Sequence, residues 1–193
     1  MKQIVLGITG ASGARYARRL IEVLIGGGGC VHAIVSPHGA ELMKLELGIE
    51  AVTPQALAGP AAQNLVLHRH DDLMDPLASG SVPTDGMAIC PCSANTLSAV
   101  AAGLGDNLIT RAAHVHLKER RTLVLVPREM PVSAIDLENQ ARLARAGAII
   151  APACPAFYLH PATIDDLVDF VAARVARCLG VRHGPVGQYG TLE

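Results

Sequence analysis

Small and polar residues follow the first apolar run of the sequence. The stretch Gly-Ile-Thr-Gly-Ala-Ser-Gly at 7–13 lies between the apolar residues 4–8 and a segment with Tyr16, Leu20 and Leu24 at helical spacing. Small residues let a ligand approach the backbone closely, and the N–H groups at the start of a helix favour an anion such as phosphate. This glycine-rich turn therefore indicates a nucleotide site.

The usual ligand of such a turn is a dinucleotide, as in short-chain dehydrogenases, but two features argue against that class. A nicotinamide dinucleotide needs an Asp, Glu or Arg after the second strand to bind the ribose, whereas here Val35 is followed by Ser36 and Pro37. Those enzymes also use Tyr-x-x-x-Lys, and no tyrosine of this sequence has a lysine four residues later. The turn is expected to hold a smaller nucleotide.

Two further polar groups follow apolar runs. Pro-Cys-Ser-Ala-Asn-Thr at 91–96 comes after the run 87–89, and its hydroxyls can cap the next helix. Pro-Arg-Glu-Met-Pro at 127–131 places Arg128 and Glu129 between two rigid prolines, although an exposed turn with an ion pair would also explain them. Ligands of an open parallel sheet bind at the carboxyl ends of its strands, where both groups are expected.

Basic side chains gather between 106 and 121. Arg111 and Lys118 are seven residues apart, which places them on one helical face about 10 Å apart along the axis. A solvated basic face would explain them equally well. Arg174 lies at the margin of the apolar stripe of the last helix, where it either reaches solvent or points into a crevice. The apolar stripe consists of Ile164, Leu167, Val168, Val171 and Val175.

The sequence contains no convincing metal site. His114 and His116 are two residues apart on a predicted helix, so they point in different directions. His68 and His70 could share a strand face but have no third ligand nearby, and the spacing of Cys90 and Cys92 is too tight for the usual zinc pair. No metal is expected, and the two cysteines are interpreted as small packing residues.

Apolar runs alternate with segments of helical period, and this alternation predicts the elements that must position the polar groups. The runs lie at 4–8, 31–35, 65–67, 87–89, 123–126 and 148–150. Such a pattern is typical of an α/β fold, an open parallel sheet with helices on both faces. Residues 1–181 are expected to form a single domain, and the glycine-rich residues 182–193 an irregular C-terminal tail.

The composition argues against several partners. The 193 residues carry 16 basic and 17 acidic side chains, for a net charge of −1. The sequence therefore lacks the excess of Lys and Arg that is typical of a nucleic-acid-binding protein. No apolar stretch approaches the length of roughly 20 residues that a membrane span needs. A cytoplasmic location is expected, because the sequence starts without a signal peptide and its five cysteines lack the spacing of a disulfide framework.

Taken together, these segments resemble the flavin prenyltransferases, the UbiX-like family. The resemblance runs in the same order from about residue 3 to 181, and the run from 117 to 129 is highly specific. The matching segments are Gly-Ile-Thr-Gly-Ala-Ser-Gly at 7–13, Ala-Ser-Gly-Ser at 78–81, Pro-Cys-Ser at 91–93, Thr-Leu-Ser at 96–98, Thr-Arg-Ala-Ala at 110–113, Leu-Lys-Glu-Arg-Arg at 117–121, Leu-Val-Pro-Arg-Glu at 125–129 and Pro-Ala-Phe-Tyr at 155–158.

The resemblance implies a Rossmann-like or flavodoxin-like, FMN-binding domain that assembles into a homo-oligomer, often a dodecamer, with the active site between subunits. It implies transfer of a dimethylallyl group from dimethylallyl phosphate to N5 of reduced FMN, followed by ring closure at C6, without a metal. The product, prenylated FMN, would serve a decarboxylase of the UbiD type.

The same resemblance assigns residues to each ligand. FMN is expected to contact Gly10, Ala11, Ser12, Ser36, Ser93, Ala94, Asn95, Thr96 and Arg111. The prenyl phosphate is expected to contact Lys118, Arg128, Tyr158 and Arg174, some of them from a neighbouring subunit. Glu129 matches the family's acid–base carboxylate, while Ser12 and Glu46 match residues that line the reaction centre.

Two alternative functions stay open. Ser-Ala-Asn-Thr at 93–96 is also typical of the related flavin-dependent cysteine decarboxylases, but these would carry Pro-x-Met-Asn where this chain has Pro-Arg-Glu-Met at 127–130. A flavin-binding subunit without catalysis would tolerate the loss of Glu129 or of the phosphate-binding cations, all of which are present.

Overall fold

The computed structural model describes residues 1–181, and the predicted tail at 182–193 lies outside the described residues. One parallel six-stranded sheet has the strand order β3-β2-β1-β4-β5-β6. Its strands are β1 (Lys2–Ile8), β2 (Gly29–Val35), β3 (Leu65–His68), β4 (Gly86–Cys92), β5 (Leu123–Pro127) and β6 (Ile149–Ile150).

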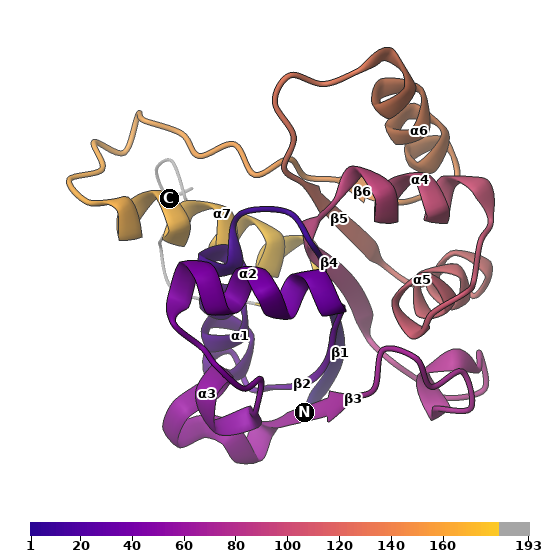
Figure 1. The fold of residues 1–193 in the computed structure, drawn as a ribbon, viewed down its shortest axis with the longest axis horizontal. Helices are drawn as coiled ribbons and strands as arrows, with labels where there is room; N and C mark the ends of the chain where they lie inside the picture. The colour runs from indigo at the N-terminus through magenta and orange to yellow at the C-terminus, as the bar shows by residue number, and fades with distance from the viewer. Residues whose placement is uncertain (182–193) are drawn as a thin grey trace, which may run out of the picture.

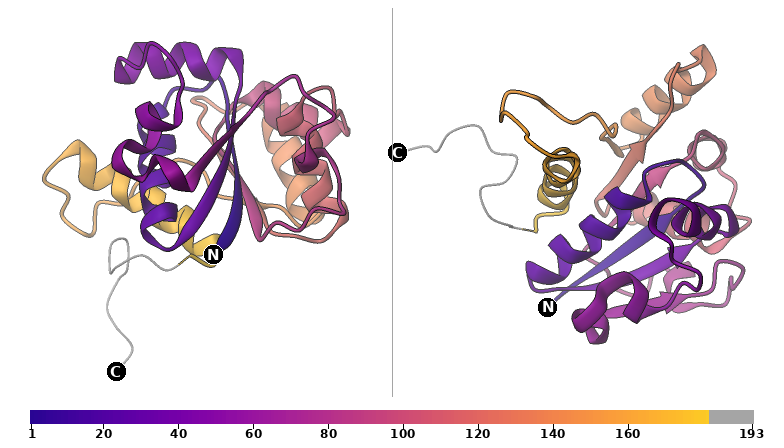
Figure 2. Two further views of the ribbon diagram at one scale, coloured as in Figure 1. Left: turned by 90° about the horizontal axis from the view of Figure 1, so that it is seen from below. Right: turned by 60° about the vertical axis from the view of Figure 1, so that its left-hand side comes forward.

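Helices cover both faces of this sheet (Figure 1). One layer consists of α1 (Ala14–Gly26), α2 (Pro37–Leu47), α3 (Pro54–Ala58) and α7 (Ile164–Cys178). The other layer consists of α4 (Ala94–Ala102), α5 (Leu108–Lys118) and α6 (Ala134–Arg145). The short 3₁₀ helices η1 (Gly59–Asn64) and η2 (Pro76–Ala78) flank β3. Figure 2 shows the same layers from two other sides, with α7 in yellow outside the sheet.

The central strands are buried on both faces, as expected for a parallel sheet between two helical layers. Every residue of β4 is buried. In β1, Ile4, Leu6 and Ile8 face the core beneath α1 and α7, whereas Val5 faces the core beneath α4 and α5. This alternation follows the two-residue period of a strand. The predicted open α/β sheet is therefore confirmed, with each predicted apolar run lying in a strand except for Ala148, which precedes β6.

Strand β1 pairs with β2 on one side and with β4 on the other. The chain leaves the carboxyl ends of β1 and β4 in opposite directions, which makes their junction the switch point where open α/β sheets bind ligands. None of the helices in residues 1–181 combines the length and hydropathy needed to span a bilayer.

One local expectation differs from the structure. Ile164, predicted to begin the apolar stripe of α7, is 67% exposed. The first turn of α7 extends past the core, where the Asp165 side chain is also 83% exposed, so the buried stripe starts at Val168.

Candidate active site

Thr9 joins the two loops at the switch point. This residue is 2% exposed, and its Oγ1 donates to the carbonyl oxygen of Pro91 at 2.8 Å and accepts from the amide of Ser93 at 2.8 Å. The amide of the buried Ala11 donates to the carbonyl of Thr9 at 2.9 Å. The sequence reasoning missed this role for Thr9; a hydroxyl directly after β1 was the available signal.

Unpaired backbone donors lie beside this junction. Among residues 1–181, no protein group accepts a hydrogen bond from the amides of Gly10, Ser12, Ala94 or Asn95. The latter two are the first residues of α4, where the helix dipole adds to the attraction for an anion. The donors at the two strand ends therefore fit a phosphate or the polar edge of a flavin.

Ser93 prepares the start of α4. Its Oγ accepts from the amide of Thr96 at 3.2 Å and donates to the Thr96 Oγ1 at 3.0 Å. Ser93 and Thr96, both predicted to contact the flavin, are thus hydrogen-bonded to each other, and Ser93 is the N-cap of α4, a position that serine favours. The Asn95 side chain is exposed next to them.

Ser36 lies at the end of the neighbouring strand β2. Its Oγ accepts from the amide of Gly39 at 3.1 Å, and its own amide donates to the carbonyl of Ile8 at 2.9 Å. A Cβ added to Gly10 would lie 2.6 Å from the Cβ of His38, so only glycine lets the loop after β1 pack this closely against α2. The structure therefore brings Ser36 next to the glycine loop.

Glu46 reaches the same loop from the far end of α2. Its carboxylate accepts from the amides of Gly13 at 3.0 Å and Ala14 at 2.8 Å. A ligand anion was predicted at the start of α1, but the carboxylate of Glu46 binds these amides instead. A phosphate at this loop would use Gly10 and Ser12 instead.

The Glu46 contact leads to a stability prediction. Replacing Glu46 by alanine is expected to lower the free energy of unfolding by about 1 kcal/mol, the usual effect of losing a helix cap. Urea unfolding followed by circular dichroism measures this difference. Glu41→Ala on the same helix is the matched control, because the Glu41 side chain is 75% exposed and such surface changes stay within about 0.5 kcal/mol. Equal effects of both variants would contradict a capping role for Glu46.

Arg128 and Glu129 follow β5 at the same edge of the sheet. The Arg128 Nε donates to the carbonyl oxygen of Ser12 at 3.2 Å, which ties the loop after β5 to the loop after β1. Glu129 is exposed, and its Oε1 accepts from the amide of Met130 at 3.3 Å. Two predicted site residues, Ser12 and Arg128, are therefore brought together from loops far apart in the sequence, and Glu129 follows Arg128 directly along the chain.

Tyr158 and Arg174 lie near one another beside α7. Arg174 lines a cavity of about 270 Å³ together with Cys154 and Phe170. The Phe170 ring meets the Tyr158 ring edge-on, with centroids 6.0 Å apart. Phe170 therefore lies beside both Tyr158 and Arg174, the two residues predicted to bind the prenyl phosphate from this side.

Arg111 and Lys118 form a separate group along α5. The Arg111 Nε donates to the carbonyl of Ala78 at 3.0 Å, and the Lys118 Nζ would lie 2.6 Å from a Cβ added to Gly80. Both cations thus lie along the loop 78–81, on one helical face as predicted. Lys118 ends α5 near the start of β5, whereas Arg128 follows the end of that strand, a separation of about 17 Å for five residues. Within one chain these two cations do not converge.

The cysteines near the switch point are buried. Cys90 is 1% exposed and Cys92 0% exposed, in agreement with their interpretation as packing residues. Burial raises the pKa of the Cys90 thiol to about 12, and burial together with Cys90 raises the pKa of Cys92. Burial, and next the neighbouring Cys90 and Cys154, raises the pKa of Tyr16. The buried thiols of Cys90 and Cys92 are therefore protonated at neutral pH, as fits packing residues.

The histidines of β2 and β3 are engaged by protein groups. The His68 Nδ1 lies 2.6 Å from the Asp75 Oδ2, and its Nε2 lies 2.9 Å from the His32 Nδ1. The His32 Nε2 lies 2.8 Å from the Gln3 Oε1, and burial lowers the pKa of His32. Over residues 1–181 there is no group of three or more His, Cys, Asp or Glu side chains suited to a metal ion.

Comparison with known proteins decides the family. The Flavoprotein family profile matches residues 1–176. The flavin prenyltransferase UbiX of Pseudomonas aeruginosa is 45% identical, with 98% of this chain and 94% of the relative covered. This chain belongs to the flavin prenyltransferase family.

Solved structures of relatives share the fold of this flavin prenyltransferase. AnUbiX in complex with FMN and dimethylallyl pyrophosphate has a TM-score of 0.89 at 36% identity, covering 100% of this chain and 99% of the other. A dodecameric FMN-dependent UbiX-like decarboxylase from Escherichia coli O157:H7 has a TM-score of 0.87 at 39% identity, covering 98% of this chain and 100% of the other. The family predicted from the sequence motifs is confirmed.

Proposed function

We propose that this flavin prenyltransferase transfers a dimethylallyl group from dimethylallyl phosphate to N5 of reduced FMN, and that ring closure at C6 follows. The observation that carries the proposal is the hydrogen bond from Arg128 to the carbonyl of Ser12, which ties the loop after β5 to the unpaired backbone amides at the switch point. This arrangement places anion-binding amides, a cation and, in Glu129, the next residue along the chain, a carboxylate at one edge of the sheet.

The glycine loop and the start of α4 are proposed to hold FMN. The amides of Gly10 and Ser12 would bind a phosphate or flavin oxygen, and those of Ala94 and Asn95 would do so from the other strand end. Ser36 would close the side of the site toward β2. Bound FMN supplies a nucleophilic nitrogen, and the protein's part is to orient it and exclude water.

The cations would stabilise the departing phosphate. Arg174 and Tyr158 are proposed to bind the prenyl phosphate from the side of α7, and Arg128 from the loop after β5. Positive charge and hydrogen-bond donors placed where negative charge develops are a large source of rate enhancement. Because these groups need no metal to neutralise the phosphate, the reaction is proposed to be metal-independent.

Arg111 and Lys118 are proposed to serve the site of a neighbouring copy, Arg111 at the FMN and Lys118 at the prenyl phosphate. Lys118 lies at the opposite edge of the sheet from Arg128, which supports assigning it to the site of a neighbouring copy. A homo-oligomer, and specifically a dodecamer like the E. coli relative, would bring the two edges together. The product would pass to a UbiD-type decarboxylase in the cytoplasm.

Anaerobic incubation with reduced FMN and dimethylallyl phosphate tests the proposal. Mass analysis of the released flavin is expected to show one added dimethylallyl group, with or without excess chelator. An unchanged flavin would contradict the function, and turnover lost in chelator but restored by metal would contradict its metal independence. Release of CO₂ from a cysteine substrate would favour the cysteine decarboxylase, to which Ser-Ala-Asn-Thr at 93–96 points.

A further inference from the structure

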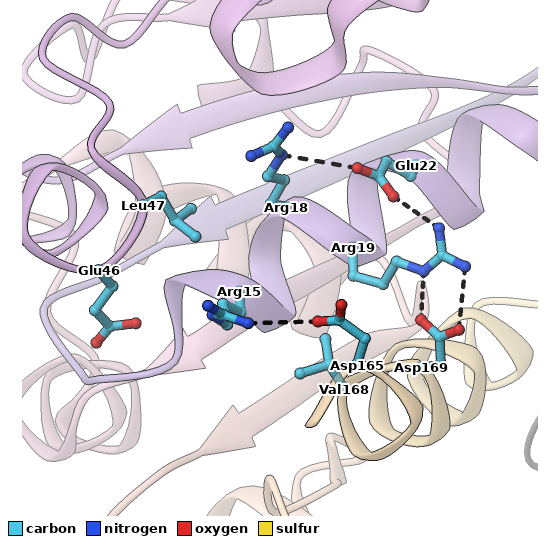
Figure 3. Close-up of a pocket in the computed structure, with 9 residues that line it drawn as sticks. All are labelled: Arg15, Arg18, Arg19, Glu22, Glu46, Leu47, Asp165, Val168 and Asp169. Carbon is cyan, nitrogen blue, oxygen red and sulfur yellow. Dashed lines mark hydrogen bonds and ion pairs between the residues drawn. The ribbon is translucent and has the colours of Figure 1, made fainter. Parts of the chain in front are cut away.

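An ion-pair network connects the two helices that frame the proposed site (Figure 3). Helix α1 starts directly after the glycine loop, and α7 carries Arg174. Helix α7 packs chiefly against α1. The position of Arg174 relative to Ser12 therefore depends on how these two helices are aligned.

Arg19 makes the best-formed contact between the helices. Its Nε lies 2.5 Å from the Asp169 Oδ1, and its Nη2 lies 3.2 Å from the Asp169 Oδ2, so the pair is bidentate. The two side chains are 33% and 25% exposed. The hydrogen bonds that Arg19 donates to Asp169 first, and to Glu22 next, raise the pKa of Arg19. The second cross-helix pair, Arg15 with Asp165 at 3.4 Å, is much more exposed.

The core cluster on this side of the sheet takes apolar side chains from both helices. Its members include Ala17, Leu20 and Leu24 of α1 and Val171, Ala172 and Val175 of α7. Apolar burial is non-directional, so it does not by itself select one alignment of the two helices along their axes. A slip of one turn would move α7 by about 5.4 Å. A bidentate pair is directional, and it distinguishes the observed alignment from a slipped one.

Phe170 and Arg174 both follow closely after Asp169 along α7. Phe170, which contacts the Tyr158 ring, is the next residue, and Arg174 is five residues on, about 7.5 Å along the axis. Phe170 and Arg174 line the same cavity. Any displacement of α7 would therefore move both predicted ligands of the prenyl phosphate together.

The groove around this network does not offer a ligand site of its own. It has a volume of about 560 Å³ and is lined by Arg15, Arg18, Arg19, Glu22, Glu46, Leu47, Asp165, Val168 and Asp169. The arginines are already paired with Asp165, Glu22 and Asp169 (Figure 3). With its arginines already paired, the groove carries no separate ligand proposal, and the inference rests on the ion pairs themselves.

We propose that Arg19 and Asp169 are positioning residues of this enzyme: their bidentate pair fixes the alignment of α7 on α1 and so holds Arg174 in place for the prenyl phosphate. The inference rests on the proposed function. It predicts an effect on the affinity for one substrate, at a distance from that substrate, that a general loss of stability would not produce.

A double-mutant cycle tests this inference with Arg19→Met, Asp169→Asn and the double variant. Each single change is expected to raise the KM for dimethylallyl phosphate about tenfold, because small misplacements of a binding group are costly. The Kd for FMN is expected to change less than about twofold, and the double variant to resemble either single one, since both remove the same contact. Arg18→Met is the matched control, because within residues 1–181 the ion pair of Arg18 stays inside α1, with Glu22 at 3.7 Å.

Several results would overturn the inference. These are an unchanged KM in both single variants, effects that multiply in the double variant, or equal losses for FMN and prenyl phosphate. If Arg19→Met does not fold, Arg19→Lys keeps the charge but not the bidentate geometry, and its KM must still rise. Wild-type protein that makes no prenylated flavin would instead refute the proposed function, so the two failures are distinguishable.

Discussion

Glu129→Gln is expected to slow turnover by about 10²–10⁴-fold, the usual contribution of a general acid–base group. The proposed reaction removes a proton from flavin N5 and later from C6, and the leaving phosphate is itself basic. Glu129 follows Arg128, whose Nε donates to the Ser12 carbonyl at 3.2 Å, so the backbone that carries Glu129 is tied to the glycine loop. Glutamine keeps the size of the side chain and removes its ability to relay a proton. Single-turnover kinetics with reduced FMN measures the change.

The structural alternative for Glu129 makes a different prediction. If the carboxylate merely stiffens its loop through the Met130 amide, the Gln variant would have a lower melting temperature and an almost unchanged rate. Both quantities are measured on the same preparation, with FMN affinity as a check on the site. Glu138→Gln, an exposed position on α6, is the matched control. A wild-type rate in Glu129→Gln would remove this residue from the mechanism.

Arg174→Ala is expected to raise the requirement for dimethylallyl phosphate steeply and to leave FMN affinity nearly unchanged. A charge-assisted contact contributes about 1.5–3 kcal/mol, which corresponds to a rise in KM of about 10–150-fold. The reason for the selectivity is geometric: Arg174 lines the cavity beside Tyr158's partner Phe170, away from the unpaired amides proposed to bind FMN. Initial rates against donor concentration and a separate FMN titration give the two quantities.

Arg142→Ala is the control for charge, because Arg142 is exposed on α6. Arg174→Lys keeps the charge without the fork of donors, and its KM should lie between those of wild type and the Ala variant. Equal losses of affinity for both ligands in Arg174→Ala would show that the division of cations between FMN and prenyl phosphate is wrong.

The elements of the sheet were predictable because their signals are local. Every predicted apolar run overlaps a strand, and the central strands β1, β4 and β5 show why: a strand buried on both faces needs a continuous apolar stretch. Helix caps were equally accessible: Ser93, Asn107 and Thr163 each bind an amide two or three residues onward. Such contacts join neighbours in the sequence and leave a recognisable residue pattern.

The sequence by itself determined the α/β fold, the family and the candidate residues, because strands, helix caps and motifs each depend on residues that are close together in the sequence. Only the tertiary structure decided how the candidates are arranged. The bonds of Thr9 to Pro91 and Ser93, of Arg128 to Ser12, and of Glu46 to the start of α1 join segments that no local period connects. The same holds for the Arg19–Asp169 pair and for the separation of Lys118 from Arg128. Parallel strands need long crossover connections, so the residues that meet at a carboxyl edge are necessarily distant along the chain.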